Sequence, residues 1–254
     1  MVTTAARVLR LGSLAVLADN SSTKNISNEN INNDKGKSMS KIKLLAGLLI
    51  LLPSMAVATV THVTLWEALP GKSAEMMATA AKAVELNKRL GMQAVTAVDS
   101  RGRLHFAMAF EDWAQWGAYQ AKAAADADMQ AFVQGYSTNP SAVQLDSFML
   151  NQPLPGAPGN VYNVFIWESY EGRSADMMTK AMEAAAIHQA DGVSIAVNVD
   201  QLGRLHYVMS FDSWADWGKL QDAPSAKWTA FMGEFQANPP GKVVQTFLAR
   251  QLPQ

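Results

Sequence analysis

The 254-residue chain carries 21 basic and 22 acidic side chains, a formal net charge of −1, so it lacks the positive surplus that binds nucleic acid or anionic membranes. It contains no cysteine, which excludes disulfides, thiolate metal sites and a cysteine nucleophile. Hydrophobic residues make up 49% of the chain, as a globular core requires.

A secretory signal peptide is predicted at residues 39–58. The segment starts with Met-Ser-Lys-Ile-Lys, continues through the apolar run 44–52 and ends in Ala56-Val57-Ala58. The apolar run is too short to span a bilayer, and the small residues at its end are typical of a cleavage site. We therefore expect cleavage after Ala58, a periplasmic or secreted protein, and no membrane association of the mature chain.

Residues 1–38 do not fit in front of a signal peptide. Residues 19–33 are rich in Asn and Ser and show no apolar period, which predicts disorder. We interpret 1–38 as a disordered segment or as one that is not translated, with Met39 as the true start. The alternative is a real transit-like or tethering arm.

The remainder of the chain contains one unit twice. The stretch Gly102–Gly117 returns as Gly203–Gly218, 101 positions later. Hydrophobic periods and turn residues predict the order βαββαβ in each copy. The expected organisation is a first module at 59–152, a Pro/Gly linker at 153–160 and a second module at 161–254.

The elements of the first copy follow in order. Ser73 is the expected N-cap of the first helix, Gly91 its C-terminal stop, and a second helix starts near 111–112. The expected strands are 62–66, 93–98, 103–110 and 142–150. In the second copy, helices start at 174 and 212, and the expected strands are 162–167, 193–199, 204–211 and 242–249. Beyond the second helix the offset falls to 99, so the second copy lacks two residues there.

One βαββαβ unit is a ferredoxin-like sandwich, whose helices cover only one face of its sheet. The bare face needs a partner. With two copies on one chain, we predict an α+β fold in which two ferredoxin-like modules pack sheet to sheet as an intramolecular pseudo-dimeric α+β barrel.

This order of elements resembles the dimeric α+β-barrel superfamily, and within it a tandem duplication of antibiotic-biosynthesis-monooxygenase-like domains. The signature Phe211-Asp212-Ser213-Trp214-Ala215-Asp216-Trp217, followed by Ala230-Phe231, resembles the same domains. The resemblance covers 60–152 and 161–252. It implies a family that includes cofactor-free oxygenases, haem-degrading enzymes and domains without assigned activity.

The resemblance also implies site residues. Monooxygenase-like members use an Asn on the first strand with Trp and His nearby, which makes Asn163, Trp167 and His206 the catalytic candidates. The first copy has His62 in place of the Asn. Haem-degrading relatives use a His on the second helix, and neither second helix here contains one. The expectation is therefore no haem and no other cofactor.

Alternation along each strand predicts which side chains line the barrel. On the third strands, Arg103, His105, Arg204 and His206 are expected to face inward, with Leu104, Phe106, Met108 and Phe110 under the helices. On the first strands, the expected inward set is His62, Thr64, Trp66, Asn163, Phe165 and Trp167. On the second strands it is Gln93, Val95, Ala97, Asp99, Ser194, Ala196, Asn198 and Asp200. Aromatic walls with a few polar groups are typical of a small-molecule pocket.

The ligand-binding candidates are the inward polar and aromatic side chains His62, Trp66, Arg103, His105, Asn198 and Arg204. The histidines could be general bases or metal ligands. Alternatively they hydrogen-bond across the seam to Asp99 or Asp200. The arginines could clamp a carboxylate or pair with the same aspartates, and the tryptophans could stack on a ligand or fill the barrel. No His-x-His or Glu-x-x-His spacing occurs, so no metal site is predicted.

Two further interpretations concern helices. Trp113, Trp116, Trp214 and Trp217 are spaced as a core-facing aromatic stripe. His188, which replaces Asn87 of the first copy, is expected to be a solvated surface residue.

Two functions follow. The first is an exported protein that holds a small apolar or aromatic molecule in its barrel, with cofactor-independent oxygenase chemistry as one form. The second is a non-catalytic structural or protein-interaction domain with a filled seam. An empty pocket of several hundred Å³ beside Asn163 and His206 would favour the first. Either function fits a monomer with an internal pseudo-dimer or a further homo-oligomer.

Overall fold

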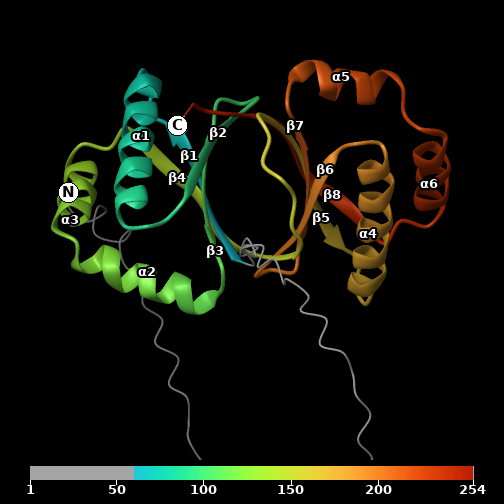
Figure 1. Ribbon diagram of the computed structural model, residues 1–254, viewed down its shortest axis with the longest axis horizontal. Helices are drawn as coiled ribbons and strands as arrows, with labels where there is room; N and C mark the ends of the chain where they lie inside the picture. Colours follow the sequence, from blue (N-terminus) through green and yellow to red (C-terminus); the bar gives the residue numbers. More distant parts are fainter. Residues whose placement is uncertain (1–59, 254) are drawn as a thin grey trace, which may run out of the picture. The chain divides into compact units, whose positions relative to one another are not determined.

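The computed structural model of the chain describes residues 60–253 (Figure 1). The predicted signal peptide, 39–58, and the upstream segment, 1–38, lie outside this part. Within it, no helix is both long enough and apolar enough to cross a membrane.

The first module has the predicted order, with one difference. Its strands are β1 (Val60–Ala68), β2 (Ala94–Asp99), β3 (Leu104–Phe110) and β4 (Ala142–Leu154), and its helices are α1 (Ser73–Arg89), α2 (Trp113–Ala125) and α3 (Ala127–Thr138). The expected second helix is thus two helices. The break falls at Asp126, whose backbone is extended and whose carboxylate accepts the Met129 N–H as the N-cap of α3.

The second module repeats this order. Its strands are β5 (Val161–Ser169), β6 (Ser194–Asp200), β7 (Leu205–Phe211) and β8 (Gly241–Gln251), and its helices are α4 (Ser174–Ala190), α5 (Trp214–Asp222) and α6 (Ala226–Ala237). Here α5 has 9 residues against 13 in α2, and Ser225 caps α6. The two missing residues therefore fall in the second half of α5 and its connection to α6.

The eight strands form one closed antiparallel barrel in the order β1-β3-β2-β8-β5-β7-β6-β4. Strands β4 and β8 join the modules, because β4 pairs with β1 of its own module and with β6, while β8 pairs with β5 and with β2. Closure leaves the described sheet without a free end strand. The predicted intramolecular pseudo-dimeric α+β barrel is confirmed.

The helices of each module pack on the outer face of its own strands (Figure 1). In the second module, Ile195 and Val197 of β6 are 0% exposed beneath α4 and α6, within one large cluster. The first module has two smaller clusters under its helices. Each module thus carries its own hydrophobic core, separate from the barrel interior.

Two helix predictions need correction. Lys72, not Ser73, occupies the N-cap of α1, and no side chain caps that helix. Trp113 and Trp214 are 48% and 45% exposed and stack edge-on against Trp116 and Trp217, so only the inner tryptophan of each pair contacts the core. The i, i+3 spacing does not distinguish a fully covered stripe from one at the margin of the helix–sheet contact.

Beyond β4, the connection at residues 155–160 lies tightly against the second module. A Cβ on Gly156 would lie 2.8 Å from the Ala196 nitrogen, and a Cβ on Gly159 would lie 2.7 Å from the Phe211 oxygen. Glycine is therefore required at both positions by close backbone approach. The connection covers the ends of β6 and β7.

Candidate functional site

The strand register tests the inward-facing predictions, because residues directly opposite one another in an antiparallel pair point to the same face. Ala97 pairs with His105, and Asn198 pairs with His206. Phe106 and Phe110 lie in the core cluster under the helices. The assignments for the second and third strands are therefore confirmed.

The assignment for the first strands is wrong. Trp66 pairs with Leu104 and Trp167 pairs with Leu205, both of which face the helices, and Asn163 pairs with Met209 on that same face. The inward residues of these strands are instead Thr61, Val63, Leu65, Tyr162, Val164 and Ile166. Both faces of these strands carry apolar side chains, so alternation defined two sets without deciding which one points inward.

The catalytic candidates are consequently divided between two faces of the sheet. Asn163 and Trp167 lie under the helices, where Trp167 contacts Phe235 edge-on at 5.3 Å between ring centroids. His206 lies on the barrel side and is 3% exposed. The structure does not bring the three side chains into one site.

His62 and Trp66 also lie under the helices. The His62 Nε2 atom is 3.0 Å from the Ser147 hydroxyl, and its Nδ1 is buried without a partner among the described residues. The Trp66 indole donates to the Thr64 hydroxyl at 2.8 Å and packs edge-on against Tyr136 of α3. These two ligand-binding candidates therefore do not line the barrel.

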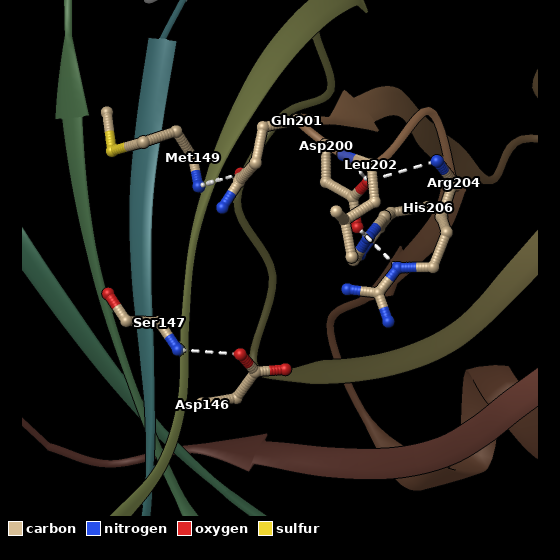
Figure 2. Close-up of polar contacts among 8 residues, drawn as sticks. All are labelled: Asp146, Ser147, Met149, Asp200, Gln201, Leu202, Arg204 and His206. Carbon is tan, nitrogen blue, oxygen red and sulfur yellow. Dashed lines mark hydrogen bonds and ion pairs between the residues drawn. The ribbon is translucent and has the colours of Figure 1, made fainter.

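On the barrel side, Asp200 is the centre of a polar cluster at the β6–β7 hairpin (Figure 2). Its Oδ1 accepts the backbone N–H groups of Leu202 and Arg204, and its Oδ2 lies 2.6 Å from the Arg204 Nε and 3.0 Å from the His206 Nε2. Burial acts to raise the pKa of Asp200, but the hydrogen bonds from His206 and Arg204 outweigh it and lower the pKa below its usual value. The carboxylate is ionised and organises the hairpin.

The first module has a looser version of the cluster. His105 Nε2 lies 3.2 Å from the Asp99 Oδ2, and Asp99 accepts the backbone N–H groups of Arg101 and Arg103. The Arg103 guanidinium instead lies 3.9 Å from Glu67. The predicted arginine–aspartate pair thus forms in the second module, whereas in the first only the Arg103 backbone contacts Asp99.

The two histidines also join the modules. His105 stacks on Phe247 of β8, with ring centroids 4.6 Å apart, and His206 contacts Phe148 of β4 at 5.1 Å. Their carboxylate partners belong to their own modules, which corrects the expectation of a hydrogen bond across the seam. Burial lowers the pKa of both rings, and the nearby aspartate only partly opposes it. Both rings are neutral near pH 7 and fill the seam.

Each hairpin also caps the strand that crosses from the other module. The Met149 N–H of β4 donates to the Gln201 side-chain oxygen at 2.8 Å (Figure 2), and the Ser100 N–H donates to the Leu248 carbonyl of β8 at 2.8 Å. The exposed Asp146 of β4 acts to raise the pKa of His206. The β6–β7 hairpin therefore extends the hydrogen bonding between β6 and β4, and the β2–β3 hairpin extends that between β2 and β8.

The barrel-facing side of the second module is the more polar. It has Asn198 and Ser210 where the first module has Ala97 and Ala109. Asn198 is 4% exposed, and its Oδ1 has no hydrogen-bond partner among the described residues. As a ligand-binding candidate it lies beside His206, as expected, but closely packed.

His188 corrects another prediction. It is 3% exposed, its Nδ1 lies 2.7 Å from the Tyr207 hydroxyl, and its ring packs 4.1 Å from that of Trp228. Burial lowers its pKa to about 4, and the opposing effect of Asp191 is smaller. The helix position alone could not show that Tyr207 would supply a buried partner.

One cavity of the described structure lies outside the barrel centre. It is a cleft of about 570 Å³ in the second module, between the 155–160 connection, the end of α4, and α5. It is lined by Ala157, Pro158, Asp191, Gly192, Val193, Ser194, Ser210, Phe211, Asp212, Asp216, Lys219, Leu220, Ala223 and Ser225. A smaller groove of about 350 Å³ lies between α1 and α3. Neither is lined by Asn163 or His206.

The equivalent place in the first module is filled. At the 101-residue offset, Asp191, Val193 and Leu220 correspond to Leu90, Met92 and Tyr119. Those three larger side chains are buried together in one hydrophobic cluster. In addition, Lys122 of α2 donates to the carbonyl of Leu90, at the C-terminal end of α1, at 2.7 Å.

The cleft therefore exists because the copies differ. Leucine, methionine and tyrosine are replaced by smaller or shorter side chains, and the connection before β5 adds a further wall. This size difference between aligned positions is the signal in the sequence that could have located the cleft. The path of the connection could not have been read from the sequence.

Comparisons with known proteins agree with this fold. No family model and no curated protein matches the sequence. Among solved structures, the chain is similar to a candidate monooxygenase of Lactobacillus acidophilus (TM-score 0.54, 11% identity, 77% of this chain and 93% of that one). A candidate monooxygenase of Fusobacterium nucleatum is similar over 78% of this chain and 93% of its own (TM-score 0.55, 11% identity). An anthrone oxidase-like protein matches at a TM-score of 0.50 and 12% identity, over 77% and 92%.

Proposed function

We propose, from the premise that this chain has the fold of the dimeric α+β-barrel superfamily with both halves on one polypeptide, that it is a small-molecule-binding protein whose site is the cleft of the second module. The observation that carries the proposal is the difference between the copies. The first module fills the equivalent place with Leu90, Met92 and Tyr119, and the second leaves about 570 Å³ open.

The cleft has the size and the lining of a ligand site. Its volume lies within the roughly 300–1,000 Å³ typical of small-molecule pockets. Its apolar walls include Val193, Phe211 and Leu220, and aspartate and serine side chains provide the polar groups. Apolar walls with a few directed polar groups give affinity and orientation, respectively.

The side chains at the barrel centre favour the alternative function, a non-catalytic structural role with a filled seam. His105 and His206 contact the opposite module through Phe247 and Phe148, and their carboxylate partners are fully buried. This arrangement favours a filled seam that holds the modules together. We therefore place the ligand in the cleft and assign the barrel centre a structural role.

The proposal stops at binding. The named neighbours include candidate monooxygenases and an anthrone oxidase-like protein, which makes oxidoreductase chemistry the form of catalysis to test. However, the register separates Asn163 and Trp167 from His206. We further propose that the exported chain, cleaved after Ala58, is the form that binds.

The direct test is native mass spectrometry of the mature protein purified from its own host. Wild-type protein should retain a small molecule, and Leu220→Tyr should release it, because the tyrosine occupies the space that Tyr119 fills in the first module. Leu202→Tyr is the matched control, since Leu202 is 74% exposed on the hairpin and does not line the cleft. Retention of the molecule by Leu220→Tyr would rule out the cleft as its site.

Oxygenase chemistry is tested with anthrone in an oxygen electrode. The expected uptake equals the rate without protein, because the three candidate side chains do not converge. Asn163→Ala and His206→Ala are measured alongside. Uptake by wild type that falls at least tenfold in either variant would show that the protein turns over and that the binding-only proposal is wrong.

A further inference from the structure

We propose that Asn198 and His206, on the barrel side of the second module, bind one buried water molecule that donates a hydrogen bond to each side chain. This site is separate from the cleft and does not depend on the proposed function. It rests on a buried amide without a partner, on the position of the proton on the histidine ring and on a break in the neighbouring strand ladder.

Asn198 supplies a buried acceptor that the described part of the chain does not satisfy. The residue lies on β6 and is 4% exposed, and its Oδ1 is buried without a hydrogen-bond partner among residues 60–253. An unpaired buried acceptor is unfavourable, and buried amides generally bond to protein groups or to ordered water. A donor is therefore required beside this oxygen.

His206 supplies a second acceptor on the adjacent strand. The two residues are directly opposite each other in the β6–β7 ladder, which places their Cβ atoms roughly 4.5–5.5 Å apart on the same face. Asp200 is ionised, because hydrogen bonds from His206 and Arg204 outweigh burial and lower its pKa, so its Oδ2 accepts from the His206 Nε2 at 3.0 Å. Burial lowers the pKa of the ring, which is neutral and carries its one proton on Nε2. The His206 Nδ1 is thus an acceptor.

Two neighbouring acceptors require a molecule with two donors. The Asn198 Oδ1 cannot bond directly to the His206 Nδ1, since neither atom carries a proton. Nor does the Asn198 amide nitrogen hydrogen-bond to the ring in the structure. Water has two donors and very little volume, and it commonly bridges buried polar groups that do not reach each other. The chemistry of the pair therefore favours water as the ligand.

The strand ladder is irregular directly beside Asn198. The register of β4 on β6 shifts between Asn151 and Leu154, so Gln152 and Pro153 both lie opposite Asn198. Such a bulge leaves one residue unpaired and disrupts the ladder locally, and a proline has no N–H to donate. The bulge therefore interrupts close strand packing at the place where the amide needs a partner.

The first module lacks this pair. Ala97 stands opposite His105 and pairs regularly with Gln251 of β8. The His105 side chain is 13% exposed, against 4% for that of His206, so bulk solvent has less access to His206. His105 thus keeps the contact with a carboxylate but faces a methyl group, which makes it an internal control.

Nitrogen-15 NMR of the mature protein at pH 7 tests the role of the ring. We expect His206 to carry its proton on Nε2. We also expect its Nδ1 resonance to move downfield in Asn198→Ala, because an unprotonated ring nitrogen is shifted upfield while it accepts a hydrogen bond and the water loses its second acceptor in this variant. The His105 resonances should stay unchanged. An Nδ1 resonance of His206 that is the same in wild type and variant would overturn the inference.

Leu220→Tyr is the control variant, because it fills the cleft and leaves both members of the pair intact. The His206 resonances should be the same in this variant as in wild type, whatever the cleft binds. An equal shift in Leu220→Tyr and Asn198→Ala would reflect a general change in packing and would overturn the assignment to Asn198.

A high-resolution crystal structure identifies the bridging group itself. The expected result is one ordered water about 2.7–3.2 Å from both the Asn198 Oδ1 and the His206 Nδ1 in wild type, and its loss in Asn198→Ala. An Asn198 amide that donates directly to Nδ1, or a wild-type site without density between the two atoms, would overturn the inference. A larger molecule bound there would overturn it as well, together with the filled seam.

Discussion

At the scale of single residues, the four histidines share a feature that their positions in the sequence do not suggest. Burial lowers the pKa of all four rings. His188 shows the effect most strongly, since its pKa falls to about 4. Its ring lies between Tyr207 and Trp228, and the nearby Asp191 acts to raise its pKa by less than burial lowers it. The neutral ring is thus part of the core of the second module.

This burial predicts a loss of stability in acid. Below about pH 6.5 the unfolded His188 binds a proton that the folded ring rejects, so the unfolded state binds more protons and stability falls as pH decreases toward about 4. Below about 4 both states are protonated and the loss levels off. Between pH 7 and pH 5, the contribution from His188 alone should be about 2 kcal/mol.

Urea unfolding at both pH values measures this change. His188→Asn is the informative variant because the first module has Asn87 at the equivalent position, where it hydrogen-bonds to Tyr119. The variant should be less sensitive to acid than wild type by about 2 kcal/mol over this range, even if it is less stable at pH 7. If wild type and His188→Asn lost the same free energy of unfolding between pH 7 and pH 5, His188 would be protonated in the folded state.

At the scale of elements, the strands differ in how well alternation predicts their faces. On β3, large residues (Leu104, Phe106, Met108, Phe110) alternate with small or polar ones, so only one face can form a core, and the prediction was right. On β5, Asn163 and Trp167 lie on one face while Val164 and Ile166 lie on the other, and both sets are compatible with burial. Only the pairing of β5 with β7 resolves the choice.

The same limit applies to the helices. Hydrophobic spacing predicted α1 and α4 well, because each forms an uninterrupted run over a sheet. It did not predict the break between α2 and α3, because Asp126 satisfies helical periodicity while its carboxylate stabilises a new N-terminus. The cleft escaped detection for a related reason. Its walls come from α4, α5 and the connection, and no single element contains its pattern.

At the scale of the whole molecule, the two modules of one chain pack against each other as two subunits would in a dimer. Residues 150–154 of β4 pair with β6, and residues 249–251 of β8 pair with β2, so each module completes the other's sheet. The same logic applies to the aromatic contacts, since Phe148 and Phe247 occupy equivalent positions at the 99-residue offset and contact His206 and His105, respectively.

This equivalence predicts that the second module alone will dimerise. In a pair of chains containing residues 161–254, β8 of each copy can pair with β6 of the other, and Phe247 can take the place of Phe148 against His206. The apolar inner face of β5, with Val164 8% and Ile166 5% exposed in the full chain, would otherwise face water. Size-exclusion chromatography with light scattering should therefore report a dimer.

Phe247→Ala in the same fragment should weaken the dimer at least tenfold, because it removes the ring that covers each histidine. In the full chain the same substitution should leave the two modules associated, since the covalent connection keeps them at high effective concentration. Circular dichroism of the fragment and of the variant checks that both are folded. A fragment that is folded and monomeric at micromolar concentration would show that the barrel seam contributes little, and that each module is stable with its inner face exposed.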